Sequence, residues 1–374
     1  MALISFIIPM YLLDNGFSYS LITLVSGIAA IPWLIKFIWG GIVDYFIKYG
    51  RKKFVIIGSI IAVFCLISLS LFNPKNGLIP FAILLCFSHM GILFMDVSAD
   101  AWAIEISIKN ERGKINGSMM AGTLVGLSLG GTFFAIISTN IGYNYVFIIA
   151  GLLVFLLAIF PFFVKELIKI KKYENISPVL ISEFKKKTTI LIAIFGLVLV
   201  INRGLHAIFP LFEKTVLNLD IIQISLLGNI GVISSISGAL VGGYLSDSWG
   251  RKRVIYVLII ICMIFSASLI FVERWEHLIL YMPITFSYFA FIIIFMAMVM
   301  DITNPRIGAT QFSIFTSISN LGEWLGVTIS GTLVTMLGFS RVFLYSAWVL
   351  GPALILLYFI KIKTPLKKTN QVIQ

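Results

Sequence analysis

The sequence predicts an all-α membrane protein with twelve transmembrane helices in two pseudo-symmetric six-helix bundles. The first observation is composition: 59% of the 374 residues are hydrophobic and 12% are charged, whereas about a quarter of a soluble domain is charged. The second is a series of apolar runs near the roughly 20 residues that cross a bilayer. The third is a charged motif that recurs about half a chain apart. We therefore expect a multi-pass protein of the cell membrane.

The apolar runs fall into two sets of six, separated by a polar stretch. We expect an N-terminal bundle over residues 1–164, a cytosolic linker over 165–189, a C-terminal bundle over 190–362 and a cytosolic tail over 363–374. The predicted helices are 1–13, 20–43, 54–72, 78–105, 115–139, 143–164, 190–212, 222–246, 254–272, 278–303, 309–337 and 339–360. The first run covers only about 20 Å of a core that is about 30 Å thick, so helix 1 is expected to be truncated.

The basic residues predict orientation rather than a nucleic-acid partner. The formal net charge of +12 comes from Lys and Arg in short gaps between apolar runs, not on a polar face. One side of the membrane holds almost all of them, and the other side holds Lys75, Lys214, Arg274 and Arg341. By the positive-inside rule both termini are cytosolic. No nucleic-acid partner is expected.

The chain offers no catalytic or metal-binding constellation. The three cysteines, Cys65, Cys86 and Cys262, lie in apolar runs without metal-ligand spacing, so we expect no metal, cofactor or disulfide framework. The short loops contain no nucleophile with its base. A membrane-embedded enzyme is therefore the weaker alternative, and the expected function is not enzymatic.

Ionisable side chains inside the apolar runs are the candidates for a transport pathway, because an ionisable group in a membrane helix faces other protein or water. Three of them, on the fourth run, are spaced by seven and four residues and share one helical stripe. The candidates are Lys36, His89, Asp96, Asp100, Arg203, His206 and Glu323. The third, sixth, ninth and twelfth runs have none in their interiors.

Depth along the helices predicts two ion pairs. Lys36 lies about 24 Å and Asp96 about 27 Å along their runs, so the two can meet. We expect Asp96 or Asp100 to carry a coupling proton beside Lys36, the alternative being a static ion pair. Arg203 and Glu323 both lie about 20 Å along, near the midplane. We expect them to contact an anionic substrate with His206 one turn beyond, the alternative being a permanent brace between helices 7 and 11.

A loop motif and a glycine pattern recur in the two halves. Two bundles joined by a charged linker are typical of a transporter with a substrate site between its repeats. Glycines spaced by four on helices 5, 8 and 11 favour close helix packing. These glycines are Gly122, Gly126 and Gly130; Gly238 and Gly242; and Gly322 and Gly326. The loop motif comprises Gly40, Asp44, Gly50 and Arg51 in the first half and Gly243, Asp247, Gly250 and Arg251 in the second.

This repeated loop motif resembles that of the major facilitator superfamily. Ser248 stands where a basic residue is usual, and five residues rather than two separate Asp44 from Gly50. The resemblance implies that runs 3, 6, 9 and 12 are peripheral. It also implies that Asp44 latches against the start of helix 11, after Arg306, and Asp247 against the start of helix 5, near Arg112.

Further motifs resemble the branch of muropeptide permeases and acetyl-CoA transporters. They are Pro32-Trp33 with Lys36, Asp96-x-x-x-Asp100, Glu111-Arg112-Gly113, Asn304-Pro305-Arg306 and Asn320-Leu321-Gly322. The resemblance implies a secondary carrier, commonly proton-coupled, for bulky polar solutes. It adds Asn320 to the pathway candidates.

The sequence thus predicts a secondary active transporter that moves a polar, anionic small solute by alternating access with proton coupling. The expected partners are this solute, a proton and the lipid bilayer, and the expected state is monomeric. The alternatives are a drug/proton antiporter or a sugar facilitator of the same fold. The fifth run, Gly122 to Thr132, lacks the Gly-Pro pair of the antiporter motif. A channel or scramblase would differ in its gradient-independent flux.

Overall fold

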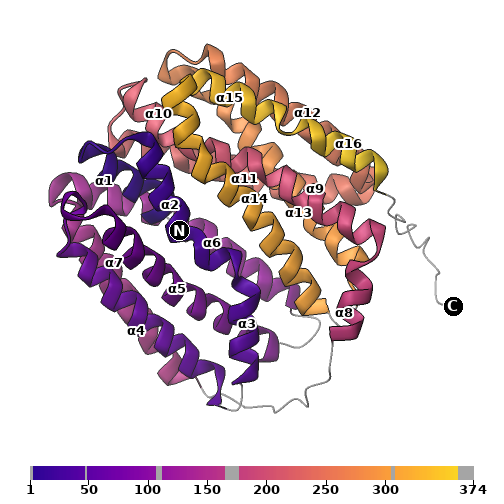
Figure 1. The fold of residues 1–374 in the computed structure, drawn as a ribbon, viewed down its shortest axis with the longest axis horizontal. Helices are drawn as coiled ribbons and strands as arrows, with labels where there is room; N and C mark the ends of the chain where they lie inside the picture. The colour runs from indigo at the N-terminus through magenta and orange to yellow at the C-terminus, as the bar shows by residue number, and fades with distance from the viewer. Residues whose placement is uncertain (1–2, 47–48, 107–111, 165–176, 305–307, 361–374) are drawn as a thin grey trace.

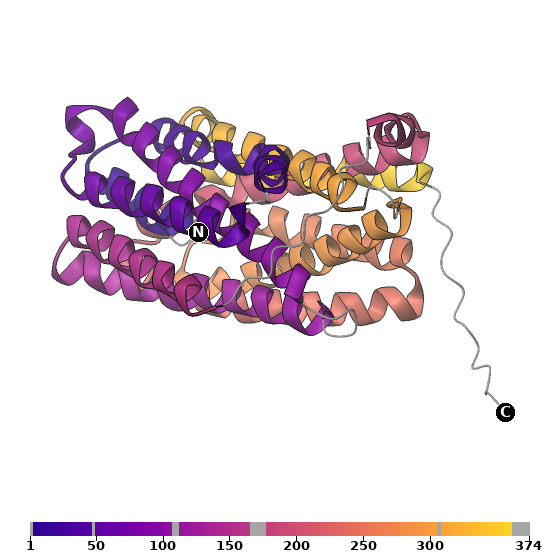
Figure 2. The same cartoon turned by 90° about the horizontal axis from the view of Figure 1, so that it is seen from below.

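The computed structural model describes residues 3–46, 49–106, 112–164, 177–304 and 308–360. Every regular element in these ranges is helical. Figure 1 shows the elements of the first half on one side of the molecule and those of the second half on the other. Figure 2, turned by 90°, shows the same lateral separation. The architecture is therefore the two-bundle, all-α arrangement that the sequence predicts.

The helices follow the predicted runs closely. In the first half they are α1 (Ile8–Asp14) after a π-helical turn (Leu3–Ile7), α2 (Tyr19–Leu34), α3 (Lys36–Tyr45), α4 (Arg51–Ser70), α5 (Leu78–Ile106), α6 (Arg112–Asn140) and α7 (Tyr143–Phe163). In the second half they are α8 (Ser177–Phe184), α9 (Lys187–Leu205), α10 (Phe209–Thr215), α11 (Ile221–Trp249), α12 (Arg251–Ser268), α13 (Met282–Ile302), α14 (Gly308–Leu337), α15 (Phe339–Trp348) and α16 (Gly351–Phe359). The expected linker contains the short helix α8.

Three predicted runs are each interrupted near a proline. Pro32 lies just before the break between α2 and α3, Pro210 lies in the first turn of α10, and the first turn of α16 likewise holds a proline. Proline has no N–H to donate and its ring clashes with the preceding turn, so an α-helix bends or restarts there. Each interruption leaves room for a cavity or re-aims the half-helix that follows it.

Ten helical segments of the described residues are long and apolar enough to cross a bilayer. The expected first and eleventh helices are not among the ten. The first is short, and α14 carries many Ser and Thr residues together with Asn320 and Glu323. A helix that faces the other half of the protein can carry such polar residues without meeting lipid.

The repeated motif glycines turn the chain at equivalent places. Gly50, before α4, has φ +83° and Gly250, before α12, has φ +90°. This left-handed backbone is open to glycine without steric cost, which explains why the motif repeats the residue. The two halves therefore share a turn as well as a helix order.

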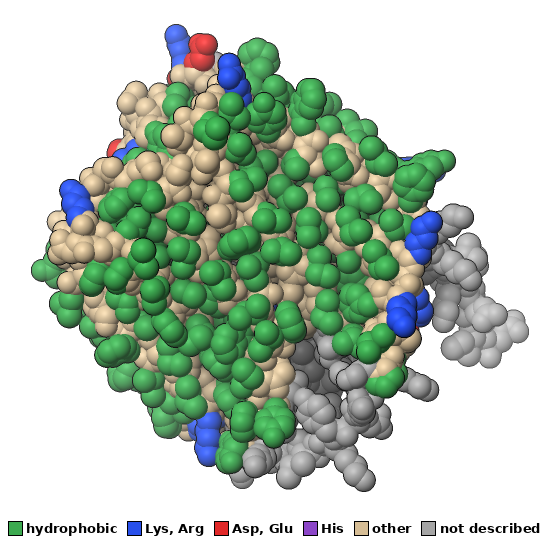
Figure 3. All heavy atoms as spheres, in the orientation of Figure 1, with side chains coloured by type: hydrophobic (Ala, Val, Ile, Leu, Met, Phe, Trp, Pro, Cys, Tyr) green, Lys and Arg blue, Asp and Glu red, His purple; other side chains and the backbone are tan. Residues whose placement is uncertain are grey.

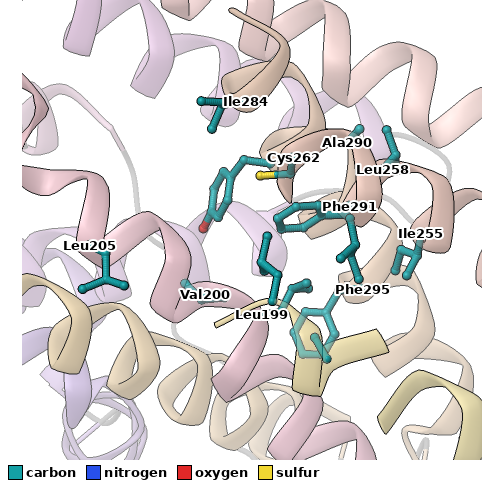
Figure 4. Close-up of a cluster of buried hydrophobic side chains, with 14 of the residues drawn as sticks. Leu199, Val200, Leu205, Ile255, Leu258, Cys262, Ile284, Ala290, Phe291 and Phe295 are labelled. Carbon is teal, nitrogen blue, oxygen red and sulfur yellow. The ribbon is translucent and has the colours of Figure 1, made fainter. Parts of the chain in front are cut away.

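Each half has its own hydrophobic core. In the second half the core joins α9, α12, α13, α15 and α16, and Figure 4 shows part of it, including Leu199, Cys262, Phe291 and Phe295. The core of the first half also contains Leu211 from the second half, together with Ile221 and Ile224. The two bundles are thus packed together at the end of the molecule where α1, α10 and the start of α11 meet.

The halves contact each other mainly through α2 with α14 and α6 with α11. The indole of Trp324 donates to the carbonyl oxygen of Gly27 at 2.8 Å. A Cβ built on Gly331 would lie 2.1 Å from the carbonyl oxygen of Tyr19. The α2 and α14 backbones are therefore in direct contact, and a glycine is required there.

The expectation of tight packing holds for two of the three glycine-rich helices. A Cβ on Gly238 or Gly242 would clash with α13, and one on Gly322 or Gly326 would clash with α9. For α6 it is wrong: a Cβ on Gly122 or Gly126 would meet nothing within 4 Å. The exposed face of α6 here has no helix close enough to need glycine.

The hydrophobic composition of the chain is also seen on its surface. Figure 3 shows a face covered by hydrophobic side chains, with Lys and Arg at its margins. Large apolar residues such as Phe64, Phe160 and Leu240 are about 70% exposed (70%, 69% and 71%). Such a surface is stable in lipid and would aggregate in water.

Candidate functional site

The first predicted pair forms in the N-terminal half. The Lys36 ammonium, at the start of α3, lies 2.7 Å from the Asp96 carboxylate on α5. Both side chains remain partly exposed, by 29% and 38%. The ammonium also lies 5.6 Å from the centre of the Trp33 ring, within the range of a cation–π contact. The break before α3 places Lys36 beside α5.

His89 lies deeper in the same half. Its ring is 3% exposed, and its Nδ1 accepts a hydrogen bond from the Trp33 indole at 3.4 Å. An accepting nitrogen carries no proton, so this contact describes a neutral imidazole. Trp33 thus contacts both His89 and Lys36, which joins part of the predicted stripe on α5 to the end of α2.

The second predicted pair forms in the C-terminal half. Nε of Arg203 on α9 lies 3.2 Å from the Glu323 carboxylate on α14. The guanidinium also contacts Tyr288, whose hydroxyl is 3.4 Å away and whose ring centre is 4.9 Å away, and lies 5.5 Å from the Phe289 ring. Arg203 is 43% exposed and Glu323 33% exposed. The pair is therefore accessible from a cavity.

Close backbone contact places this second pair. A Cβ on Gly204 would lie 2.2 Å from the Glu323 carbonyl oxygen and 2.7 Å from the Gly326 Cα. Because α9 and α14 touch through these glycines, the side chains of Arg203 and Glu323 emerge beside each other. The four-residue glycine spacing therefore supports the site as well as the packing.

His206 does not extend the Arg203 site as expected. Its Nε2 lies 3.2 Å from the Ser266 hydroxyl and 3.1 Å from the Ser346 hydroxyl, within the C-terminal core. The three-residue 3₁₀ turn that begins at His206 rotates the ring away from the ideal helical position. His206 therefore uses Nε2 to join α9 to α12 and α15, although it also borders the cavity.

Asn320 connects the halves. Its side-chain amide donates to the carbonyl oxygen of Trp33 at 3.2 Å. Trp33 precedes the break between α2 and α3, where backbone carbonyls lose helical partners. Asn320 thus ties α14, which carries Glu323, to the segment that carries Lys36.

A cavity of about 280 Å³ lies between the halves. Its walls come from α6 of the first half and from α9, α10, α11 and α13 of the second. Polar groups on its wall include Arg203, Glu213, Asn229, Tyr281 and Ser128. The Ser128 hydroxyl donates to Asn229 at 2.7 Å, which links α6 to α11 across the boundary between the halves.

The structure adds charged residues that the sequence reasoning missed. Lys214 of α10 forms an ion pair with Asp14 at the end of α1, and the Tyr143 hydroxyl donates to Asp14 at 2.7 Å. Glu213, next to Lys214, is 5% exposed and lines the cavity. The predicted seventh run ends at residue 212, so Lys214 counts only as a basic residue between runs and Glu213 is not singled out. The signal that could have found these residues is Pro210, which restarts the helix so that it continues through both of them.

The structure places some of the predicted gating residues. Arg251 forms an ion pair with Asp301, joining the loop motif to the end of α13. Gly243 has open space around it, with its nearest contact at 4.0 Å from Ile293. Arg306 and the side chains of Asp44, Asp100, Arg112 and Asp247 lie outside the described residues.

Comparison with known proteins agrees with this architecture. The AmpG 2 protein of Rickettsia felis is 23% identical over 367 residues, which cover 94% of this chain and 89% of that protein. A bacterial homolog of the human lysosomal transporter Spinster, in an inward-facing and unoccupied conformation, superposes with a TM-score of 0.76 at 14% identity and covers 96% of this chain and 92% of its own.

The inward-open xylose transporter XylE from E. coli has a TM-score of 0.75 at 13% identity, with 98% of this chain and 93% of that chain covered. Likeness at such identity establishes the fold alone. The sequence itself matches the Major Facilitator Superfamily over residues 1–322. With two helical halves around a charged cavity, this chain belongs to the Major Facilitator Superfamily of membrane transporters.

Proposed function

We propose that the protein is a secondary active transporter that moves a polar, anionic small solute by alternating access, coupled to proton movement. The observation that carries the proposal is the half-exposed Arg203 guanidinium beside the cavity between the halves. Its planar fork suits a carboxylate or phosphate. Glu323 supplies the counter-charge that a guanidinium inside the membrane needs.

The two ion pairs suit a carrier better than a fixed scaffold. Each pair is partly exposed and each joins helices of one half only: α3 with α5, and α9 with α14. A solute anion can compete with Glu323 for Arg203, which frees a carboxylate to take up a proton. Asp96 or Asp100 is the corresponding proton carrier in the N-terminal half.

In this proposal the protein lies in the cell membrane as a monomer with both termini in the cytosol. The end where Asp14 pairs with Lys214 is then the outer end, and it is closed. The superposition on inward-facing transporters supports this assignment of the state. Alternating access requires the outer contacts to open while the cytosolic ends of the halves approach each other.

Binding can be tested with the purified protein. A thermal-shift panel of carboxylates, phosphates, neutral sugars and amines is expected to give stabilisation by anionic members, because a ligand that binds only the folded state raises the Tm. Arg203→Gln should weaken the effective anion about tenfold or more, since it removes charge-assisted hydrogen bonds. Arg341→Gln, on an exposed side chain away from the cavity, is the matched control.

Coupling needs a transport assay. Proteoliposomes that contain the anion identified by the panel are expected to accumulate it against its gradient when an inward proton gradient is imposed. Collapsing the gradient with a protonophore should leave only equilibration. Stabilisation by neutral sugars alone, or flux that ignores the proton gradient, would contradict the proposal.

A further inference from the structure

Glu213 stands apart from the other acidic side chains of the described membrane spans. Asp96 pairs with Lys36, Glu323 with Arg203, and Asp301 with Arg251. Glu213 makes no hydrogen bond or ion pair through its side chain with any described residue, and it is 5% exposed. A buried carboxylate without a counter-charge is costly, so such a group either takes up a proton or binds a positive charge.

The neighbouring basic side chains do not form an ion pair with Glu213. Lys214, the next residue, pairs with Asp14 of the other half. Arg203 lies along the same wall but is paired with Glu323. His206 is engaged with Ser266 and Ser346. No described basic side chain therefore supplies Glu213 with a counter-charge.

The cavity wall carries two opposite charges. Arg203 and Glu213 are ten residues apart along α9 and α10, and both line the cavity. At 1.5 Å per residue this corresponds to roughly 15 Å between their Cα atoms, or on the order of 10–15 Å between charges that lean inward. Tyr281 lines the same cavity as both charges.

Aromatic rings also line the wall of this cavity. Tyr281 stacks on Phe209 with ring centres 3.7 Å apart and an interplanar angle of 11°. Tyr288 lies under the Arg203 guanidinium. Aromatic rings on a cavity wall favour an ammonium group, because their negative faces attract it. A proton alone would gain nothing from them.

We infer that Glu213 binds an ammonium group of an elongated zwitterionic solute whose anionic group binds Arg203. This inference rests on the proposed anion site at Arg203 and adds the solute's second charge. The cavity volume of about 280 Å³ corresponds to roughly ten water volumes at about 30 Å³ each. An extended tripeptide is about 10 Å long at 3.3–3.6 Å per residue, which matches the shorter end of the separation between the two charges.

Four versions of one peptide separate the two charges. The probes are Ala-Ala-Ala, its N-acetyl form without the ammonium, its C-terminal amide without the carboxylate, and the doubly blocked peptide. We expect Ala-Ala-Ala to bind the wild-type protein about tenfold more tightly than the N-acetyl form, because the latter loses a charged contact. The doubly blocked peptide should bind most weakly.

Glu213→Gln provides the decisive variant. It should reduce the affinity for Ala-Ala-Ala to that of the N-acetyl peptide while leaving the N-acetyl affinity unchanged. Glu213→Asp, which retains the charge, should retain part of the preference. A Tm at least equal to that of the wild type is expected for Glu213→Gln, since it removes an uncompensated carboxylate, and it reports correct folding.

The outcomes distinguish the two proposals. The ammonium site is overturned if Ala-Ala-Ala and its N-acetyl form bind equally well, or if Glu213→Gln weakens the binding of both equally. The transporter proposal still stands in that case if anion binding depends on Arg203. The ammonium site is also overturned if Na⁺ stabilises the wild type more than choline does at equal ionic strength and Glu213→Gln abolishes this difference. That result would show a metal-cation site. If the binding of every anionic probe, including the N-acetyl peptide, is independent of Arg203, both the ammonium site and the anion site are overturned.

Discussion

At the scale of single residues, Arg203 and Glu323 admit two roles that a charge swap separates. Arg203→Glu with Glu323→Arg keeps an ion pair across α9 and α14, because the two side chains face each other at 3.2 Å. It moves the positive charge to the other helix and away from Tyr288. A brace survives such a swap, whereas a substrate anchor does not.

We expect the swapped protein to retain its Tm within a few degrees and to lose at least tenfold in apparent affinity for the transported anion. The measurements are thermal unfolding and concentration-dependent uptake in proteoliposomes. Each single substitution is the control, and each should be less stable than the double variant because it leaves like charges together. Unchanged uptake in the double variant would exclude the anchor role.

The Lys36–Asp96 pair allows a second residue-scale prediction. Asp96→Asn removes a carboxylate that can exchange a proton, so gradient-driven accumulation should fall to equilibration if Asp96 couples transport. Lys36→Met with Asp96→Asn tests the static alternative, because the double variant leaves no unpaired charge in the membrane. Accumulation restored in the double variant identifies a static pair; accumulation lost in both identifies coupling.

At the scale of elements, the contact of α2 with α14 determines which state is populated. Gly331→Ala would place a Cβ 2.1 Å from the Tyr19 carbonyl oxygen and 2.4 Å from the Thr23 hydroxyl. Overpacking of this kind costs about 1–3 kcal/mol. Because this contact joins the halves at the Asp14 end, the cost applies to the state seen here and not to one in which that end opens.

Spin labels at positions 140 and 340, both exposed near that end, should show a longer distance and a larger open population in Gly331→Ala. Gly351→Ala, where a Cβ meets nothing within 4 Å, is the control and should leave the distribution unchanged. An unaltered distribution in Gly331→Ala would mean that α2 and α14 stay together throughout the cycle.

The short helix α8 is held by an acidic side chain outside the spans. Glu183 pairs with Lys186 at 2.5 Å and accepts a hydrogen bond from the Asn304 amide at 2.8 Å. The Lys186 contact, followed by that of Asn304, lowers the pKa of Glu183 below its ordinary 4.5. A lowered folded pKa contributes stability above the ordinary value, and this stability is lost as pH falls through the folded pKa.

Wild-type protein should therefore exceed Glu183→Gln in Tm by a constant margin above about pH 5, and the margin should close as the pH falls below about 4. Thermal unfolding across a pH series measures it. Glu276→Gln, on an exposed residue, controls for general effects of charge. A margin that persists at the lowest pH would assign the difference to packing of the side chain.

At the scale of the whole molecule, the closure of one end depends on a small polar contact between bundles. Asp14 pairs with Lys214 of the other half and accepts from Tyr143, with 24% and 40% of the Lys214 and Asp14 side chains exposed. Exposed pairs contribute about 0.2–1 kcal/mol and are screened by salt. The contact thus biases the equilibrium between states without locking it.

Asp14→Asn should raise the ratio of open to closed molecules at this end by about two- to fivefold at low salt, with the effect shrinking as salt increases. The label pair at 140 and 340 reports it. Lys75→Gln removes an exposed charge that is not part of the contact and should have no effect. A shift that does not depend on salt would argue against an electrostatic latch.

Whole-molecule features followed from the sequence because they depend on local quantities. The apolar runs and the recurring loop glycines are set by hydropathy and backbone chemistry, whereas the breaks near the prolines were not predicted. Depth is counted along each helix at about 1.5 Å per residue. That count was sufficient to bring Lys36 to Asp96 and Arg203 to Glu323, and both pairs form.

Only the tertiary structure decided which way each helix faces. These helices are apolar on nearly all sides, so no hydrophobic stripe distinguishes a lipid face from a protein face. The rotation of each helix comes from its packing, through contacts such as Gly204 against Glu323 and Gly331 against Tyr19. For this reason the sequence could not reveal that Ser266 and Ser346 engage His206, that Lys214 joins Asp14, or that Glu213 faces the cavity without a counter-charge.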